Sequence, residues 1–483
     1  MTPPRISNRA RGRLRAALAL LLCVCLGLPP LPAFSSDIEL PDIGDPASQA
    51  LTLAQEQALG REILKEIRRN LPLIEDPEVT SYVRSLGLRL VAASPDAHPD
   101  FHFLVIQDPA INAFATPGGV VAINTGLLTA ARNEAEVAAV VAHEIAHVTQ
   151  RHLARRYAGS GRIDLATGLG ILAAILVSAY STEAAEAALY SSIAAGAQQQ
   201  LDFSRANEQE ADRIGIITLA GAGFDPHAMP AFFERLQRLN FTSPDAIPEY
   251  LSTHPVTTSR ISDSVARADQ YQGDYRSDSE EFQLIQARTR ALSSDPARLL
   301  REYEETPMPA RTTRVRYTQT IALQRAGRHD QALAMAQTLN REKPDTLPYQ
   351  LLLAEAQLGA SKAHDALANL EPLDAVYPRY APVTALMARA LMANGKPTEA
   401  RRKIEAILAS GHEEPAFLKL RAEAAAAEDL VSLSHEAMAD YYLAHGQVST
   451  AVRQLELALD ARDLDSTSEA RIRSKLRALN PTK

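Results

Sequence analysis

Apolar residues recur every three or four positions along most of this chain, a period that predicts amphipathic helices. The pattern covers residues 51–93 and returns over residues 204–222 and 229–239. A long helix is predicted over residues 133–156, and residues 241–259, which contain Pro, Thr and Ser, are interpreted as a loop. The pattern therefore predicts a mainly helical protein.

Two short segments have the alternation of β-strands instead. Residues 101–107, FHFLVIQ, alternate in polarity, and residues 112–124 predict a strand, a turn around Pro117 and Gly118, and a second strand. These strands interrupt an otherwise helical pattern. The predicted fold class is α+β, mainly helical, with a small β-sheet in the first half of the chain.

The first 35 residues have the layout of a secretory signal peptide. Five arginines precede an apolar stretch at residues 16–28, and prolines and small residues follow it, with Ala33 or Ser35 as cleavage points. The apolar stretch is too short to cross a bilayer comfortably, so a cleaved leader over residues 1–35 is favoured over an uncleaved anchor.

A second apolar stretch lies in the middle of the chain. Residues 165–182 carry no charge, but glycine, serine and alanine make the stretch only weakly apolar. A packed or interfacial helix is favoured over a membrane span, and contact with a membrane surface through residues 165–180 stays open.

Composition and charge narrow the class of protein. The 483 residues are too many for one core, and a net charge of −8 gives no basic excess for binding nucleic acid. Both cysteines lie in the leader, and without its five arginines 45 basic residues face 58 acidic ones, a net charge of −13. A cysteine-free, acidic, exported chain fits the bacterial periplasm.

The last part of the chain is rich in alanine and repeats itself. Residues 271–307 are interpreted as a helical connector, and residues 308–483 as helical repeats. Ala332, Ala366 and Ala400 are spaced 34 residues apart, each with a glycine five or seven residues before it. This period resembles the tetratricopeptide repeat, whose stacked helix pairs leave a concave groove. A generic helical bundle is the alternative.

The sequence His143-Glu144-Ile145-Ala146-His147 carries the strongest chemical signal. Histidines at positions i and i+4 of a helix face the same side and can bind one metal ion. Glu144 is rotated by about 100° from His143, beside the metal rather than on it. There it can take a proton from water, so the motif predicts a hydrolytic zinc site.

A third ligand has to come from elsewhere in the chain. The metzincin pattern would need Gly at 150 and His at 153, where this chain has Gln150 and Leu153. His152 lies about 140° around an unbroken helix from His147, which predicts a surface or loop-packing role.

A second predicted helix offers acidic candidates. Glu208 and Asp212 are at positions i and i+4, so Glu208 can ligate the metal while Asp212 fixes the tautomer of a ligand histidine. Glu210 is turned by about 200° and is interpreted as a solvated acid. The alternative is that all three form a charged helix face.

Four motifs together resemble peptidase family M48. They are the HExxH segment, the downstream ExxxD of Glu208 and Asp212, the stretch NAFATPGGVVAINTGLL before the zinc helix, and STHPVTTSR after it. The resemblance implies a zincin-like protease domain over residues 36–270 that binds one Zn²⁺ per subunit. A leader and a repeat tail are similar to those of the periplasmic members of the family.

The resemblance also implies a role for individual residues. It carries over three zinc ligands, a catalytic base and a carboxylate behind the ligands: His143, His147, Glu208, Glu144 and Asp212. The strand near residues 113–124 matches one that holds an extended substrate.

Two further positions match residues of the family's loop. His254 either reaches the zinc and blocks it or hydrogen-bonds the oxyanion. Arg260 either orients substrate or pairs with an acid. A histidine packed against Pro255 in a turn is the structural alternative.

The resemblance favours a periplasmic zinc endopeptidase. It implies misfolded or stalled outer-membrane β-barrel proteins as substrates, with the repeats docking to the barrel-assembly machinery or to the client. The alternative is a chaperone or scaffold that acts through its repeat groove, with the protease site autoinhibited by His254. A purely structural zinc site is disfavoured because such sites are usually rich in cysteine.

Overall fold

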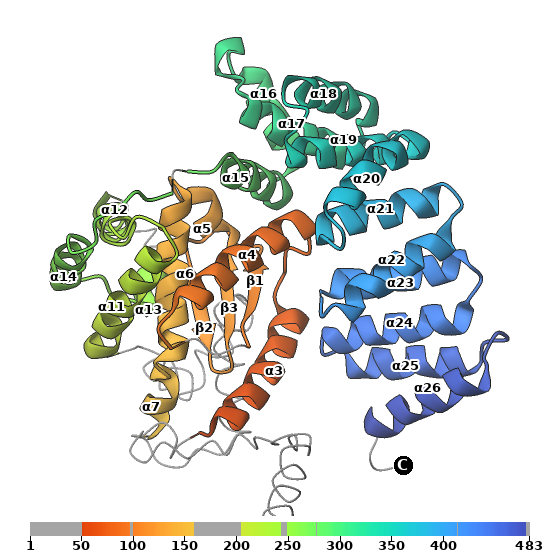
Figure 1. The fold of residues 1–483 in the computed structure, drawn as a ribbon, viewed down its shortest axis with the longest axis horizontal. Helices are drawn as coiled ribbons and strands as arrows, with labels where there is room; N and C mark the ends of the chain where they lie inside the picture. The colour runs from red at the N-terminus through yellow and green to blue at the C-terminus, as the bar shows by residue number, and fades with distance from the viewer. Residues whose placement is uncertain are drawn as a thin grey trace, which may run out of the picture. The chain divides into compact units, whose positions relative to one another are not determined.

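The computed structural model describes residues 51–96, 100–158, 204–242, 249–276, 278–412 and 414–479. The predicted leader (1–35) and the uncharged stretch (165–182) lie outside these residues. The described chain is mainly helical with one small sheet, as the sequence predicts (Figure 1). None of the helices in the described ranges is both long enough and apolar enough to cross a membrane.

The first half of the chain surrounds a three-stranded sheet of order β1-β3-β2. The strands are β1 (His102–Ile106), β2 (Ala113–Thr116) and β3 (Val120–Asn124). The helices are α3 (Leu53–Asn70), α4 (Pro77–Ala93), α5 (Thr125–Ala130), α6 (Glu134–Thr149), α7 (His152–Ala158), α11 (Arg205–Gly221), α12 (Ala228–Thr242), α13 (Glu249–Thr253) and α14 (Thr258–Ala268). The short helix α13 corrects the prediction of an uninterrupted loop over residues 241–259.

The sheet separates two hydrophobic clusters. Strand β3 is buried along its whole length and pairs parallel with β1 and antiparallel with β2. One face, with Phe103 and Val121, packs against α4 and α6, and the other, with Val120 and Ala122, packs against α3 (Figure 1). The alternation of β-strand side chains thus places a helix layer on each face.

The predicted helix over residues 133–156 is interrupted at residues 150–151 and forms two helices instead of one. Helix α6 ends at Thr149, and α7 begins at His152 after a left-handed residue, Arg151, with φ of 51°. The Arg151 guanidinium donates to Glu56 at 3.0 Å and to the Leu51 carbonyl. These long-range contacts stabilise a backbone turn that the periodicity of the sequence does not reveal.

The second half of the chain is a succession of helices. They are α15 (Glu280–Ser293), α16 (Pro296–Glu305), the 3₁₀ turn η2 (Met308–Ala310), α17 (Thr313–Arg325), α18 (His329–Glu342), α19 (Leu347–Gly359), α20 (Ala363–Val376), α21 (Ala381–Ala393), α22 (Pro397–Ala409), α23 (Pro415–Ala427), α24 (Val431–Ala444), α25 (Val448–Leu459) and α26 (Ser466–Leu479). Helix α15 is more than a connector, because Phe282 belongs to the core of the first half and Leu284 to that of the repeats.

The backbone conformation of the repeats has the same period of 34 residues as the sequence. Left-handed residues end helices at Gly327, Ser361, Gly395 and Asp429, a spacing of 34 residues. After α17, the N–H of Arg328 bonds the Leu323 carbonyl, the pattern of a Schellman cap. The second repeat therefore turns at Ser361 and not at Gly359, where the sequence placed its glycine.

Candidate active site and metal centre

Helix α6 supplies the paired histidines. Asn133 caps its N-terminus by accepting a hydrogen bond from the N–H of Glu136, and nearly every α6 side chain is buried. His143 and His147 lie one turn apart, and their Nε2 atoms are 3.0 Å from each other. The helix thus holds two imidazoles that converge on one point, as the i, i+4 spacing predicts.

Helix α11 brings a carboxylate to the same point. A Cβ at Gly215 would lie 2.8 Å from Met229 Cε and 3.4 Å from the backbone nitrogen of His143, so a glycine permits close approach of α11 to α6. Glu208, in the first turn of α11, has carboxylate oxygens 3.3 Å from His147 Nε2 and 3.5 Å from His143 Nε2.

This donor set fits a divalent metal ion such as zinc. One ligand atom from each of His143, His147, Glu208 and His254 lies within 4.8 Å of the others, and all four side chains are buried. Glu144 is buried beside them, and its Oε1 has no hydrogen-bond partner among the described residues. Imidazole nitrogens and carboxylate oxygens directed at one point, with an adjacent glutamate, are the ligand types of catalytic zinc sites.

Asp212 and Arg260 form a second layer behind these ligands. Asp212 Oδ1 lies 3.0 Å from His143 Nδ1, which leaves Nε2 of that imidazole for a metal. Arg260, on α14, donates to both oxygens of Asp212, at 2.7 and 2.8 Å, and its Nη1 lies 2.8 Å from Glu208. The guanidinium is buried, so Arg260 pairs with acids here rather than facing a substrate.

Of the two roles predicted for His152, at the surface or packed by a loop, the structure excludes the surface role. It is completely buried, and its Nδ1 lies 2.8 Å from Nδ1 of His147, while its Nε2 lies 3.0 Å from Glu210. Burial lowers the pKa of His152 to about 4, so the ring is neutral. If Glu210 accepts the Nε2 proton, His152 Nδ1 accepts from His147, whose Nε2 then faces the metal position.

Glu210 is consequently not only a solvated acid. Its side chain is 38% exposed, but it binds His152 and also Arg155, whose Nη2 lies 2.8 Å from it. Sequence reasoning missed the pair of His152 and Glu210 because it depends on the turn at Arg151. The one available signal was a third histidine close to the HExxH segment.

Glu144 faces the outer strand of the sheet. Helix α6, which carries Glu144, packs against β2, and β2 is the edge strand on this side of the sheet. Burial raises the pKa of Glu144, although nearby histidines oppose the shift. A carboxylate thus lies between the metal position and a strand edge that can pair with an extended chain.

His254 occupies the remaining side of the cluster. Its N–H bonds the Tyr250 carbonyl, and its ring stacks on Tyr250 with centroids 4.8 Å apart. Its Nδ1 is 3.1 Å from Glu208 and 3.3 Å from His143 Nε2, and its Nε2 is 3.4 Å from Glu144. The ring therefore contacts ligand and base candidates together. Tyr250 was not expected from the sequence.

The protonation states of these buried side chains depend on whether a metal ion or a proton lies between them. Burial alone would lower the pKa of His143, but hydrogen bonds to Asp212 and Glu208 outweigh it and raise the pKa to about 9. Burial lowers the pKa of His147. The histidines hold the pKa of Glu208 well below its usual range despite its burial. A metal ion bound at His143 would therefore have to displace a proton, and its affinity would fall as the pH falls.

All seven side chains selected from the sequence lie in this one buried cluster: His143, Glu144, His147, Glu208, Asp212, His254 and Arg260. They come from α6, α11, α14 and the residue after α13. The arrangement can bind a metal ion, hold a proton at Glu144 and present an extended chain along β2.

Comparisons with known proteins agree with this arrangement. The model of peptidase family M48 matches residues 77–268, and a tetratricopeptide-repeat model matches residues 357–424. The chain is 35% identical over 456 residues to the β-barrel assembly-enhancing protease of Escherichia coli K12, covering 92% of each chain. It is 46% identical over 253 residues to a putative β-barrel assembly-enhancing protease of Vibrio cholerae, covering 52% of each. It is 37% identical over 154 residues to the mitochondrial metalloendopeptidase OMA1 of Arabidopsis thaliana, covering 32% of this chain and 28% of that one.

Proposed function

Since this chain belongs to peptidase family M48 and is a metalloendopeptidase, we propose that it is a periplasmic zinc protease of outer-membrane β-barrel proteins. The buried convergence of His143, His147 and Glu208 carries the proposal, because three N and O ligands leave a fourth position for chemistry, the one beside which His254 lies. The Escherichia coli relative, a β-barrel assembly-enhancing protease, supports the substrate class.

The residues around the metal position have separate roles in peptide hydrolysis. His143, His147 and Glu208 would hold the zinc ion, which would supply a Lewis acid for the scissile carbonyl and the attacking water. Glu144 takes the proton of that water and passes it to the leaving amine. Asp212 holds His143 in the ligating tautomer, and Arg260 fixes Asp212 and Glu208 through its hydrogen bonds.

The substrate lies along β2 as an added strand. Main-chain pairing with an edge strand needs little side-chain specificity, which suits a protease that acts on misassembled chains. Helix α6 packs against β2, so the base lies on the helix next to the strand that would hold the scissile bond.

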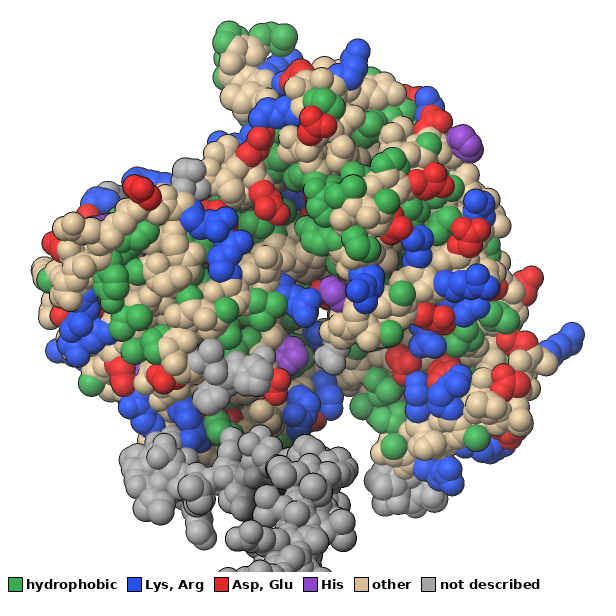
Figure 2. Space-filling model, viewed as in Figure 1, with side chains coloured by type: hydrophobic (Ala, Val, Ile, Leu, Met, Phe, Trp, Pro, Cys, Tyr) green, Lys and Arg blue, Asp and Glu red, His purple; other side chains and the backbone are tan. Residues whose placement is uncertain are grey.

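The remaining parts of the proposal concern location and partners. The leader at residues 1–35 exports the chain, the protease domain covers residues 36–270, and residues 271–307 connect it to repeats over residues 308–483. The repeats dock to the barrel-assembly machinery or to the client, as tetratricopeptide surfaces bind other proteins. Lys and Arg are interspersed with Asp and Glu on the face drawn in Figure 2, which supports protein partners over nucleic acid.

The experiment for the catalytic part is Glu144→Gln in the full chain. Gln keeps the shape but cannot take the proton, so the variant should bind one zinc per chain and lose cleavage of an unfolded barrel protein. Zinc content is measured by atomic emission and cleavage by gel electrophoresis. Proteolysis equal to that of the parent would refute the mechanism.

A second state of the site is supported by the position of His254. Its contacts with Glu208, His143 and Glu144 favour a ring that blocks the metal over one that waits for an oxyanion. We propose that this state is autoinhibited and leaves the repeat groove to act as a chaperone. His254→Ala should then raise proteolysis, whereas His227→Ala, an exposed histidine bonded to Asp225, should not. Lower proteolysis in His254→Ala would support the oxyanion role instead.

A further inference from the structure

The sheet has a second edge, opposite the one beside Glu144. Strand β1 ends the order β1-β3-β2 on that side. The N–H of His102 donates to the Gly119 carbonyl, so the main-chain groups of His102, Leu104 and Ile106 point at β3. Those of the alternate residues Phe101 and Phe103 point outward.

A short partner already begins to pair with this edge. The N–H of Ile74 donates to the Val105 carbonyl at 2.9 Å, and Leu73 forms an antiparallel bridge with Ile106. The chain then leaves β1 and enters α4 at Pro77. An extended segment placed in line with this bridge would meet Phe103 and then Phe101.

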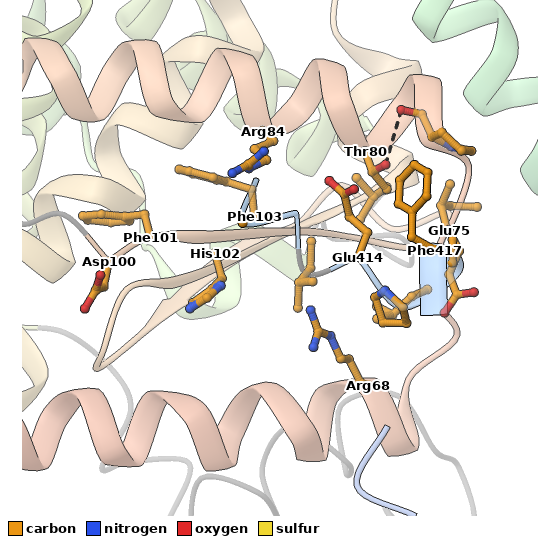
Figure 3. A pocket seen from close by; sticks show the side chains of 18 residues that line it. Arg68, Glu75, Thr80, Arg84, Asp100, Phe101, His102, Phe103, Glu414 and Phe417 are labelled. Atoms are coloured by element: carbon orange, nitrogen blue, oxygen red, sulfur yellow. Dashed lines mark hydrogen bonds between the residues drawn. The ribbon is translucent and has the colours of Figure 1, made fainter. Parts of the chain in front are cut away.

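The outward side of β1 opens into a cleft of about 260 Å³ between α3, α4 and the start of α23 (Figure 3). Aromatic rings of Phe101, Phe103 and Phe417 line it. Arg68 from α3 and Arg84 from α4 line it as well. A strand edge bordered by two helices admits an extended chain more readily than a folded domain.

Glu414 gives this cleft a second, independent feature. Its side chain points into the space (Figure 3), and its Oε2 is buried without a hydrogen-bond partner among the described residues. A buried acceptor that bonds nothing is costly, and such atoms usually mark a missing donor. The N–H groups of a bound peptide, or a basic side chain on it, would supply that donor.

We propose that the β1 edge binds an extended segment of an unfolded β-barrel client as an added strand, with Glu414 accepting a hydrogen bond from it. The segment's alternating apolar and polar side chains, typical of barrel strands, fit the aromatic and the charged parts of the lining. This inference rests on the proposed substrate class, but it concerns a site that does no chemistry.

Two edges of one sheet would then hold two segments of the same client. A segment bound at β1 raises the effective concentration of the rest of that chain at β2, where cleavage takes place. Long unfolded clients would therefore bind more tightly than short peptides that reach one edge only.

The test uses the inactive full chain Glu144→Gln and a fluorescent ten-residue peptide with barrel-strand alternation and a photo-crosslinker. Anisotropy gives the affinity, and mass spectrometry locates the crosslinks. Crosslinks are expected at residues 100–106 and 414–417. Adding Glu414→Ala should weaken binding about tenfold, the loss of one hydrogen bond to a charged group. Glu399→Ala, an exposed glutamate in the repeats, should bind as the parent does.

Peptides methylated at alternate backbone nitrogens provide the matched control. An added strand uses every second N–H, so methylation in one phase should abolish binding at β1 and in the other should not. Crosslinks confined to residues 113–124, crosslinks between two copies of this chain, or equal binding by the Glu414→Ala and Glu399→Ala proteins would overturn the proposal. Failure of the zinc-loaded parent to cleave would refute the proposed function instead, because binding is measured here without cleavage.

Discussion

Arg288, on α15, joins the first half of the chain to the repeats through a buried ion cluster. Its guanidinium lies 2.7 Å from both oxygens of Asp76, 3.1 Å from Glu78 and 3.1 Å from Glu355, and the residue is 4% exposed. Asp76 caps α4, and Glu355 lies in α19. One cation therefore lies beside three acidic side chains from two segments, both of them distant from it in sequence.

Replacing this cation should destabilise the protein strongly. Arg288→Met keeps the length of the side chain but leaves the acids buried without a counter-charge, and breaking a buried pair costs about 3–5 kcal/mol. The stranded acids will have their pKa values raised in the folded state above those in the unfolded state. The loss therefore grows as the pH rises, by up to about 1.4 kcal/mol per pH unit for each proton that folding takes up.

Urea unfolding followed by circular dichroism at pH 5 and pH 7 measures this loss. Arg298→Met is the control, because Arg298 pairs with Glu302 at 2.9 Å with a side chain 72% exposed. Such surface pairs contribute about 0–1 kcal/mol. A loss for Arg288→Met equal to that of the control, or one larger at pH 5 than at pH 7, would refute the reasoning.

Three further predictions follow from buried contacts. Burial raises the pKa of Glu78 to about 8, so its contribution to stability is present below pH 4.5 and is lost as the pH rises to 8. The free energy of unfolding should therefore fall less steeply across this pH window in Glu78→Gln than in the parent. Parallel curves for the two proteins would contradict this. His152→Ala should weaken zinc binding about 10–100-fold in competition with a chelator, while the exposed His227→Ala should match the parent; equal affinities for the two variants would remove the positioning role. A Cβ at Gly126 would lie 2.2 Å from the Pro109 carbonyl oxygen, so Gly126→Ala should lower the free energy of unfolding in urea by about 1–3 kcal/mol. Gly273→Ala should lower it little, because no neighbour lies nearer than 3.9 Å to a Cβ there. Similar losses of stability in the two variants would count against the clash.

The candidate ligands could be found from the sequence because helical geometry relates them. A spacing of four residues sets His143 beside His147, and the same spacing sets Glu208 beside Asp212. The fold class followed from periodicity in the same way. These features depend on residues that are neighbours within one helix, so a single sequence is enough to predict them.

The parts that failed depend on contacts between distant segments. The turn at Arg151 requires Glu56 and the Leu51 carbonyl, and it alone brings His152 to His147. The repeat turn at Ser361 has a left-handed backbone without glycine, so residue type pointed elsewhere. Periodicity cannot reveal either of them, because neither is a property of a local pattern.

The ring of His254 follows a short helix of its own, whereas the paired histidines and Glu208 lie on two long helices that pack together. Under the proposed autoinhibition, the ring would withdraw with its own short helix while the two long helices stay in place. Only molecules with the ring withdrawn would then bind substrate at the metal. If one molecule in a hundred has its ring withdrawn, the apparent substrate affinity is about a hundredfold lower than the intrinsic affinity. Clients that favour the withdrawn state by about 2.7 kcal/mol would recover that factor. Under the proposed autoinhibition, the ring would therefore set the binding strength that a chain needs in order to be cut.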